Sequence, residues 1–153
     1  MISNEQTAEV LNDLIRINND RIAGYERADN ETESKDADLK ALFRDMASES
    51  RKYVSELSSH VAGSGEQPAD GTTTSGKIYR AWMDIKATFT GKDRKAILAS
   101  CEFGEDAAQK AYDSALKTDA ELPTELRQLI MDQKTSLRKS HDQIKLMRDS
   151  QPA

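Results

Sequence analysis

Four long stretches of the chain repeat apolar side chains at the three- and four-residue spacing of an α-helix, and this periodicity restricts the fold more than any other feature. The stretches cover residues 4–31, 35–62, 93–118 and 123–149. Each is long enough to run the length of a small domain and carries an apolar stripe that has to be buried. The pattern therefore predicts an all-α protein in which residues 1–153 form a single four-helix-bundle domain.

The connections between these stretches differ in length, and the difference indicates the topology. The first and last connections are short, which predicts two antiparallel hairpins. The middle connection is long: residues 63–75 form a loop rich in Gly, Ser and Thr, and residues 76–89 form a short amphipathic helix that carries Trp82. Two hairpins joined by a long crossover give the connectivity of ferritin-like bundles. An up-down-up-down bundle is the alternative if the short helix folds back.

Composition and charge argue against several classes of function. The net charge of −5 and the scattered Lys and Arg residues give no basic face for nucleic acid. No apolar run is long enough to span a membrane. A single cysteine, Cys101, excludes an intramolecular disulfide framework and a multi-cysteine zinc site. The N-terminus shows no signal-peptide pattern, so we expect a cytoplasmic protein.

The most informative polar residue is Glu105, which interrupts the apolar stripe of the third stretch. A carboxylate in a bundle core has to be paired, protonated or bound to a metal, because an isolated buried charge costs several kcal/mol or more. Other polar residues fall on the core faces at a similar depth. The predicted polar core layer consists of Asn18, Arg21, Tyr25, Ser50, Glu105 and His141.

Three interpretations of this layer are open. The first is a buried ion pair between Arg21 and Glu105, with no cofactor and no catalytic residue. The second is a di-iron or di-manganese centre, with ligands from the set Glu26, Glu102, Glu105 and His141. The third is a small anionic ligand paired with Arg21, which no independent feature supports.

The metal interpretation conflicts with the motif that such centres use. Bundle di-iron sites require a Glu-x-x-His element on each of two helices. In this chain Lys52 stands three residues after Glu49, and Arg138 stands three residues before His141. Both elements are therefore absent, and the ion pair is the favoured interpretation.

The short helix over residues 76–89 raises a separate question about partners. Its apolar face, centred on Trp82, either closes the bundle or anchors a homo-oligomer interface, where aromatic residues often dominate the binding energy. The sequence identifies no protein partner.

Several segments together resemble a bacterial family of uncharacterised four-helix-bundle proteins in the ferritin-like superfamily. The resemblance rests on residues 10–15, 18–25, 71–76, 82–86, 93–98, 101–106 and 141–142, and the run Cys101 to Asp106 is its most specific part. It implies a ferritin-like fold but no activity, because the family is of unknown function. Ferritin relatives with intact ligand sets store or oxidise iron, and this chain departs from them at both Glu-x-x-His elements.

These observations favour a non-enzymatic bundle with a structural or protein-interaction role. A place in bacterial stress physiology follows only from analogy of fold. The alternative is a metal-binding ferritin-like protein with oxidative or metal-handling activity.

Overall fold

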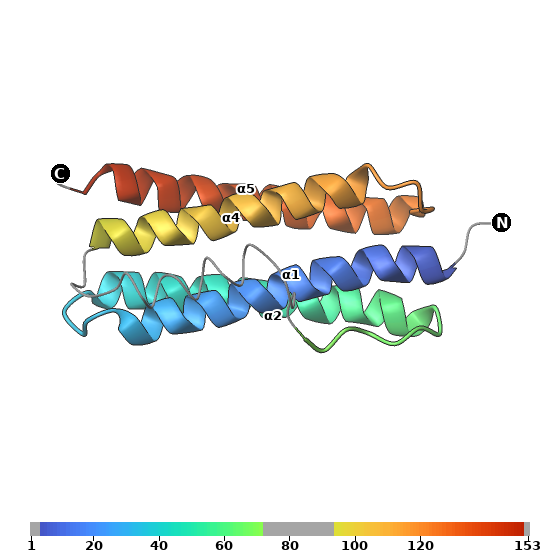
Figure 1. Cartoon of the computed structure of the whole chain (residues 1–153), viewed down its shortest axis with the longest axis horizontal. Helices are drawn as coiled ribbons and strands as arrows, with labels where there is room; N and C mark the ends of the chain where they lie inside the picture. The colour runs from blue at the N-terminus through green and yellow to red at the C-terminus, as the bar shows by residue number, and fades with distance from the viewer. Residues whose placement is uncertain (1–3, 72–93, 152–153) are drawn as a thin grey trace.

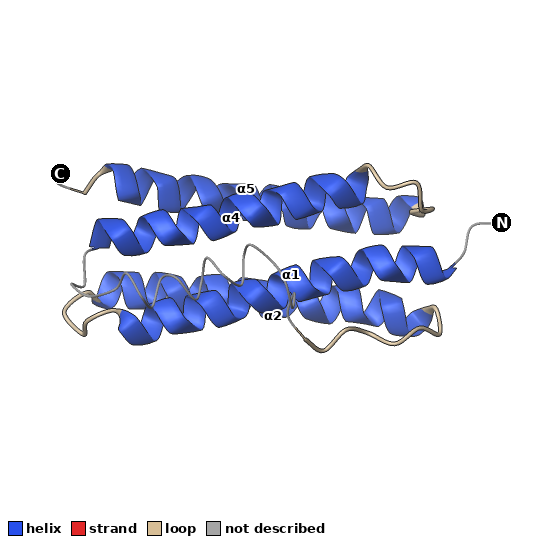
Figure 2. Ribbon diagram, in the orientation of Figure 1, coloured by secondary structure: helices blue, strands red, loops and turns tan. Residues whose placement is uncertain are grey.

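The computed structural model of the chain describes residues 4–71 and 94–151, and within these ranges all regular structure is helical (Figure 2). The helices are α1 (Asn4–Glu31), α2 (Ala37–Gly63), α4 (Arg94–Leu116) and α5 (Thr124–Asp149). The short helix predicted over 76–89, with Trp82, lies outside the described residues, as do residues 72–75 of the predicted crossover loop.

The helices form two antiparallel hairpins packed against each other, α1 with α2 and α4 with α5 (Figure 1). The hairpins also meet through α1 and α4. Helix α2 ends at one end of the bundle and α4 begins at the opposite end, so α2 and α4 run parallel (Figure 1). This is the crossover connectivity predicted from the unequal connections, and the ferritin-like fold is confirmed rather than the up-down-up-down alternative.

Local chemistry explains where the helices end. Helix α2 ends at Gly63, and Gly65 follows with a φ of 85°, a left-handed conformation that glycine adopts without steric cost. Pro123 directly precedes the first residue of α5, so the helix begins one residue later than the predicted stretch 123–149. The Pro123 carbonyl accepts a hydrogen bond from the backbone N–H of Arg127 at 2.9 Å.

One arginine ties the starts of the two parallel helices together. Arg94, the first residue of α4, places Nη1 at 2.8 Å from Asp36 Oδ1 and Nη2 at 2.8 Å from Asp38 Oδ2. The Asp36 carboxylate caps no backbone N–H of α2. The ion pairs therefore help to fix α4 beside α2 at this end of the bundle.

The core consists of two apolar clusters, one towards each end. One contains Leu11, Leu14, Leu57, Ile130 and Leu137 among others. The other contains Tyr25, Leu39, Phe43, Leu98 and Ile144 among others. Buried polar residues lie between the two clusters along each helix. None of the described helices is long and apolar enough to cross a membrane.

Candidate functional site

Arg21 lies at the middle of the bundle, and all three nitrogens of its guanidinium group have partners. Nε donates to Glu105 Oε1 at 2.6 Å. Nη1 donates to the Met46 carbonyl at 3.1 Å and to Ser50 Oγ at 2.8 Å. Nη2 lies 2.9 Å from Glu49 Oε1 and 3.3 Å from the Met46 sulfur. Arg21 is only 2% exposed, so its charge is neutralised inside the protein and not by water.

The hydrogen bonds continue from Arg21 through all four helices. Ser50 Oγ donates to Asn18 Oδ1 at 2.9 Å, and Asn18 Nδ2 donates to the Tyr112 hydroxyl at 2.9 Å. Tyr112 in turn donates to Gln133 Oε1 at 2.6 Å. Gln133 Nε2 donates to Glu56 Oε1 at 3.2 Å, so this series of hydrogen bonds ends on α2, the helix that also carries Ser50. This connected set is called the central layer below.

Glu105 completes the central layer from α4, and its two oxygens differ in their surroundings. Arg21 Nε and the Tyr25 hydroxyl both donate to Oε1, each at 2.6 Å. Oε2 is buried and has no hydrogen-bond partner among the described residues. An unsatisfied buried acceptor costs about 1–3 kcal/mol, which the two hydrogen bonds at Oε1 and the charge of Arg21 have to offset.

The charges of the layer shift the pKa values of the groups around it. Burial alone lowers the pKa of Arg21, but the charges of Glu105, Tyr25 and Glu49 and the hydrogen bond to Glu105 raise it above its ordinary value overall. Burial, reinforced by Glu105, raises the pKa of Tyr25 and of Cys101 well above their ordinary values. Cys101 therefore stays a protonated thiol and is a poor nucleophile.

Sequence reasoning missed Glu49, whose helical angle points mostly outside the core. Its Oε1 pairs with Arg21 and accepts from Ser140 Oγ at 3.0 Å, and its Oε2 accepts from the Tyr53 hydroxyl at 3.2 Å. Arg21 therefore faces two carboxylates, Glu49 and Glu105, from opposite hairpins. A helical angle gives the direction of Cβ but not the reach of a long side chain, so the sequence carried no signal for this contact.

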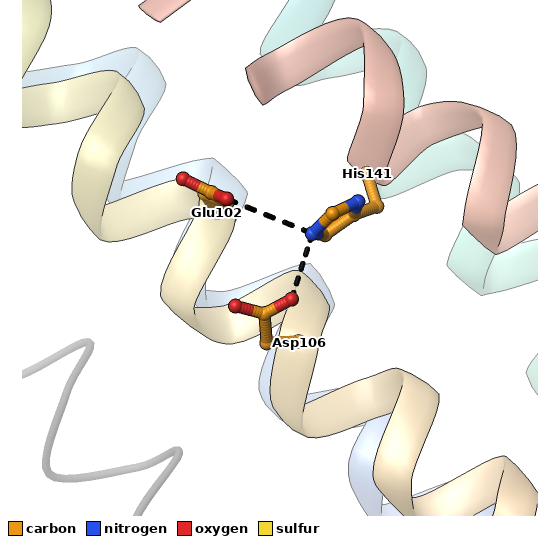
Figure 3. Close-up of side chains that lie close together, drawn as sticks. All are labelled: Glu102, Asp106 and His141. Atoms are coloured by element: carbon orange, nitrogen blue, oxygen red, sulfur yellow. Dashed lines mark ion pairs between the residues drawn. The ribbon is translucent and has the colours of Figure 1, made fainter.

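His141 is buried, but it belongs to a second cluster and not to the central layer. Its Nε2 lies 2.7 Å from Asp106 Oδ1 and 3.7 Å from Glu102 Oε1, both on α4 (Figure 3). Its Nδ1 lies 3.0 Å from Asp142 Oδ1. The donor atoms of Glu102, Asp106 and His141 all lie within 4.8 Å of one another, and all three are residue types that ligate metal ions. These three residues are called the flank cluster below.

His141 is buried as predicted but lies apart from the other members of the predicted polar core layer. A turn of about 100° per residue puts His141 about 40° to one side of Leu137 and Ser140 about 60° to the other. His141 consequently faces α4, whereas Ser140 faces Glu49 of α2. Asn18, Arg21, Tyr25, Ser50 and Glu105 are brought together as a hydrogen-bonded set, and no bond among the described residues joins His141 to it.

The alternative ligand set predicted from the sequence does not form one centre. Glu26 is on the surface, where it pairs with Arg51. Glu105 is engaged by Arg21. Only Glu102 and His141 of the predicted set approach each other, and Glu102 Oε2 is also paired with Arg148. Asp106, which the sequence did not single out, is the ligand-type residue that joins them.

Comparison with known structures supports the class of fold defined by this geometry. The chain is similar to a solved structure described as a mutant of Dps1 from Mycobacterium smegmatis, with a TM-score of 0.75. The match covers 95% of this chain and 96% of the other at 15% sequence identity. At this identity the likeness concerns the fold alone, and the chain is a ferritin-like four-helix bundle.

The sequence also defines the family within that class. Residues 6–118 match the family described as "Domain of unknown function (DUF2383)", and the chain belongs to this family. The resemblance to an uncharacterised ferritin-like family predicted from the sequence is thereby confirmed. No curated protein matches the chain in sequence.

Proposed function

We propose that this protein is a non-enzymatic ferritin-like bundle with a structural or protein-interaction role. The observation that supports this most is the position of Arg21, whose guanidinium group lies at the bundle centre with partners on every nitrogen. A permanent cation at this position repels a divalent ion, and it pairs with one oxygen of Glu49 and one oxygen of Glu105. The central layer then serves to hold the helices in register, a use to which buried ion pairs are suited.

Because Arg21 and its partners fill the bundle centre, we propose that the protein acts through its surface. Phe103, Met131 and Leu146 are large apolar side chains that are exposed on α4 and α5. Self-association, a cytoplasmic location and a place in bacterial stress physiology extend the same proposal; the last follows from analogy of fold. Sedimentation velocity of the full chain tests self-association: a single species of monomer mass at all concentrations would remove that extension.

Oxygen consumption after Fe²⁺ is added to the full chain tests the main proposal. The Asp106→Asn background removes one ligand of the flank cluster, and comparison with the double variant isolates any oxidation that depends on Glu105. We expect Asp106→Asn and Asp106→Asn/Glu105→Gln to consume oxygen no faster than buffer that contains Fe²⁺ alone. A saturable rate that is lost only in the second variant, with both proteins folded, would overturn the proposal.

The alternative function, metal handling, is favoured by one specific observation, the convergence of Glu102, Asp106 and His141. This function does not require the di-iron or di-manganese centre that was the alternative interpretation of the sequence. A single ion at the edge of the bundle is compatible with the ion pair at its centre.

A further inference from the structure

We propose that Glu102, Asp106 and His141 form a binding site for one divalent transition-metal ion on the α4–α5 side of the bundle. The proposal does not rest on the function proposed above, because these residues lie outside the central layer. Glu102 and Asp106 are one helical turn apart on α4, and His141 reaches them from α5 (Figure 3). The site would therefore join the two helices of one hairpin.

The distances between the donor atoms suit a common ion. Two ligands that each lie about 2.1 Å from a metal are about 3.0–3.4 Å apart in octahedral or tetrahedral geometry. His141 Nε2 lies 2.7 Å from Asp106 Oδ1 and 3.7 Å from Glu102 Oε1, which are distances on either side of that range. In the proposed complex the side chains shift so that these separations enter that range.

Each buried ligand is also held by a partner on its far side. His141 Nδ1 faces Asp142 Oδ1 at 3.0 Å, and Arg138 Nε lies 3.3 Å from the same Asp142 oxygen. Arg148 pairs with Glu102 Oε2, which leaves Oε1 to face the histidine. A carboxylate on the second ring nitrogen is the usual support of a metal-binding histidine, because it fixes the tautomer whose Nε2 carries the lone pair.

A divalent ion would satisfy the three acceptor atoms of this arrangement together. When Nδ1–H donates to Asp142, the Nε2 lone pair points at the Asp106 carboxylate, and Glu102 Oε1 adds a third acceptor. A proton on Nε2 makes one good hydrogen bond, to Asp106, whereas a metal ion engages all three atoms. A divalent ion would therefore add Glu102 Oε1 to the contact that a proton on Nε2 makes with Asp106 alone.

The ligand types restrict the choice of metal. One imidazole and two carboxylates, without a thiolate, suit Zn²⁺, Mn²⁺ or Fe²⁺ and do not suit Cu⁺. The Asp106 side chain is 54% exposed, which leaves a path for the ion and a position for water. Three protein ligands and an open position are the composition of a reactive or exchangeable site more than of a closed structural one.

Isothermal titration of the metal-free full chain with Zn²⁺ tests the site. We expect one ion per chain and at least about a tenfold loss of affinity in Asp106→Asn and in His141→Gln. Asp113→Asn is the matched control, because Asp113 is a similarly exposed α4 carboxylate that pairs with Lys134 of α5. His60→Gln controls for the second histidine of the chain. Both controls should bind Zn²⁺ as the unchanged protein does.

Three outcomes would overturn the proposal. One is no Zn²⁺ binding by the unchanged chain. Another is binding that survives both Asp106→Asn and His141→Gln in folded protein, which circular dichroism verifies. The third is binding that Glu105→Gln abolishes and Asp106→Asn does not, in which case the ion would lie in the bundle centre, and the proposed function would fail as well.

Discussion

The central layer and the flank cluster both gather carboxylates around a nitrogen base, but they differ in the nature of the cation. In the central layer Glu49 and Glu105 face Arg21, whose charge is part of the chain and cannot exchange. In the flank cluster Glu102 and Asp106 face His141, whose ring nitrogen binds a proton or a metal ion. The permanent cation, Arg21, lies inside the bundle, whereas the proposed site for an exchangeable ion lies at its edge.

This difference separates stability from binding. A buried pair that loses one member leaves an uncompensated charge where no water reaches it, so changes in the central layer act mainly on the free energy of unfolding. Asp106 is half exposed and is screened by solvent, so changes there act mainly on ligand binding. The following predictions test the comparison, from the largest expected effect to the smallest.

Replacing Arg21 should have the largest effect. Arg21→Met leaves Glu105 buried and unpaired and should lower the free energy of unfolding by about 3–5 kcal/mol. The double variant Arg21→Met/Glu105→Leu removes the pair but leaves Glu49 without Arg21 and the Tyr25 hydroxyl without its acceptor, so it should regain only part of that loss. Urea denaturation of the unchanged protein, both single variants and the double variant measures these effects. Additive losses in the double variant would show that Arg21 and Glu105 do not interact.

Removing the Tyr25 hydroxyl should have an intermediate effect. Tyr25 donates to Glu105 Oε1 at 2.6 Å, and its ring also lies beneath the Arg21 guanidinium group, 5.1 Å from ring centroid to Cζ. Tyr25→Phe keeps the ring and loses a hydrogen bond to a charged group, so stability should fall by about 1.5–3 kcal/mol. Phe103→Tyr, a change at an exposed position, is the control. An unchanged melting curve for Tyr25→Phe would mean that Arg21 alone satisfies Glu105.

Alkaline pH should weaken the central layer. Burial raises the pKa of Tyr25 well above its ordinary value and that of Tyr53 to about 12. Above the ordinary phenol pKa of about 10 the unfolded chain loses protons that the folded chain keeps, so the free energy of unfolding falls as pH rises, by at most about 1.4 kcal/mol per pH unit for each group. Urea denaturation from about pH 9 to 11 measures the slope. In Tyr25→Phe the free energy of unfolding should fall less steeply with pH than in the unchanged protein. Equal slopes would show that the pKa of Tyr25 is not raised by folding.

Changing Asp106 should have the smallest effect on stability. Its side chain is 54% exposed, and exposed ion pairs contribute about 0–1 kcal/mol. Asp106→Asn should therefore unfold within about 1 kcal/mol of the unchanged protein when no metal is added. Urea denaturation in the presence of a chelator measures this. A loss as large as that of Arg21→Met would show that the flank cluster is structural and not a binding site.

The residues of the central layer show what periodicity can and cannot predict. The angles around each helix identified Arg21 and Glu105 as core-facing groups at the same depth, and the unequal connections predicted the antiparallel hairpins. Both inferences depend on the spacing of side chains along one helix or on the length of a loop. Side-chain spacing and loop length can both be read directly from the sequence.

The flank cluster was harder to predict because it depends on how two helices are rotated against each other. The position of His141 near Leu137 on α5 predicts a core-facing side chain. The core-facing side of α5 contacts two helices, however: His141 contacts α4, and Ser140 contacts α2. Asp106 was not singled out because a carboxylate at an exposed position has no periodic signal. Glu26 was proposed as a ligand, although the register of α1 and α2 brings it to Arg51 on the surface.

Thermal unfolding with and without Zn²⁺ tests the central claim most directly. The claim is that the central layer holds a permanent cation, whereas the flank cluster binds an exchangeable one. The proteins to compare are the unchanged chain, Glu105→Gln and Asp106→Asn. We expect Zn²⁺ to raise the Tm of the unchanged chain, because an ion that binds only the folded state stabilises it. Glu105→Gln should melt at a lower temperature, with a loss of about 3 kcal/mol, and still respond to Zn²⁺. Asp106→Asn should keep a Tm close to the original and lose the response. A Zn²⁺ response that is lost in Glu105→Gln and kept in Asp106→Asn would contradict the division.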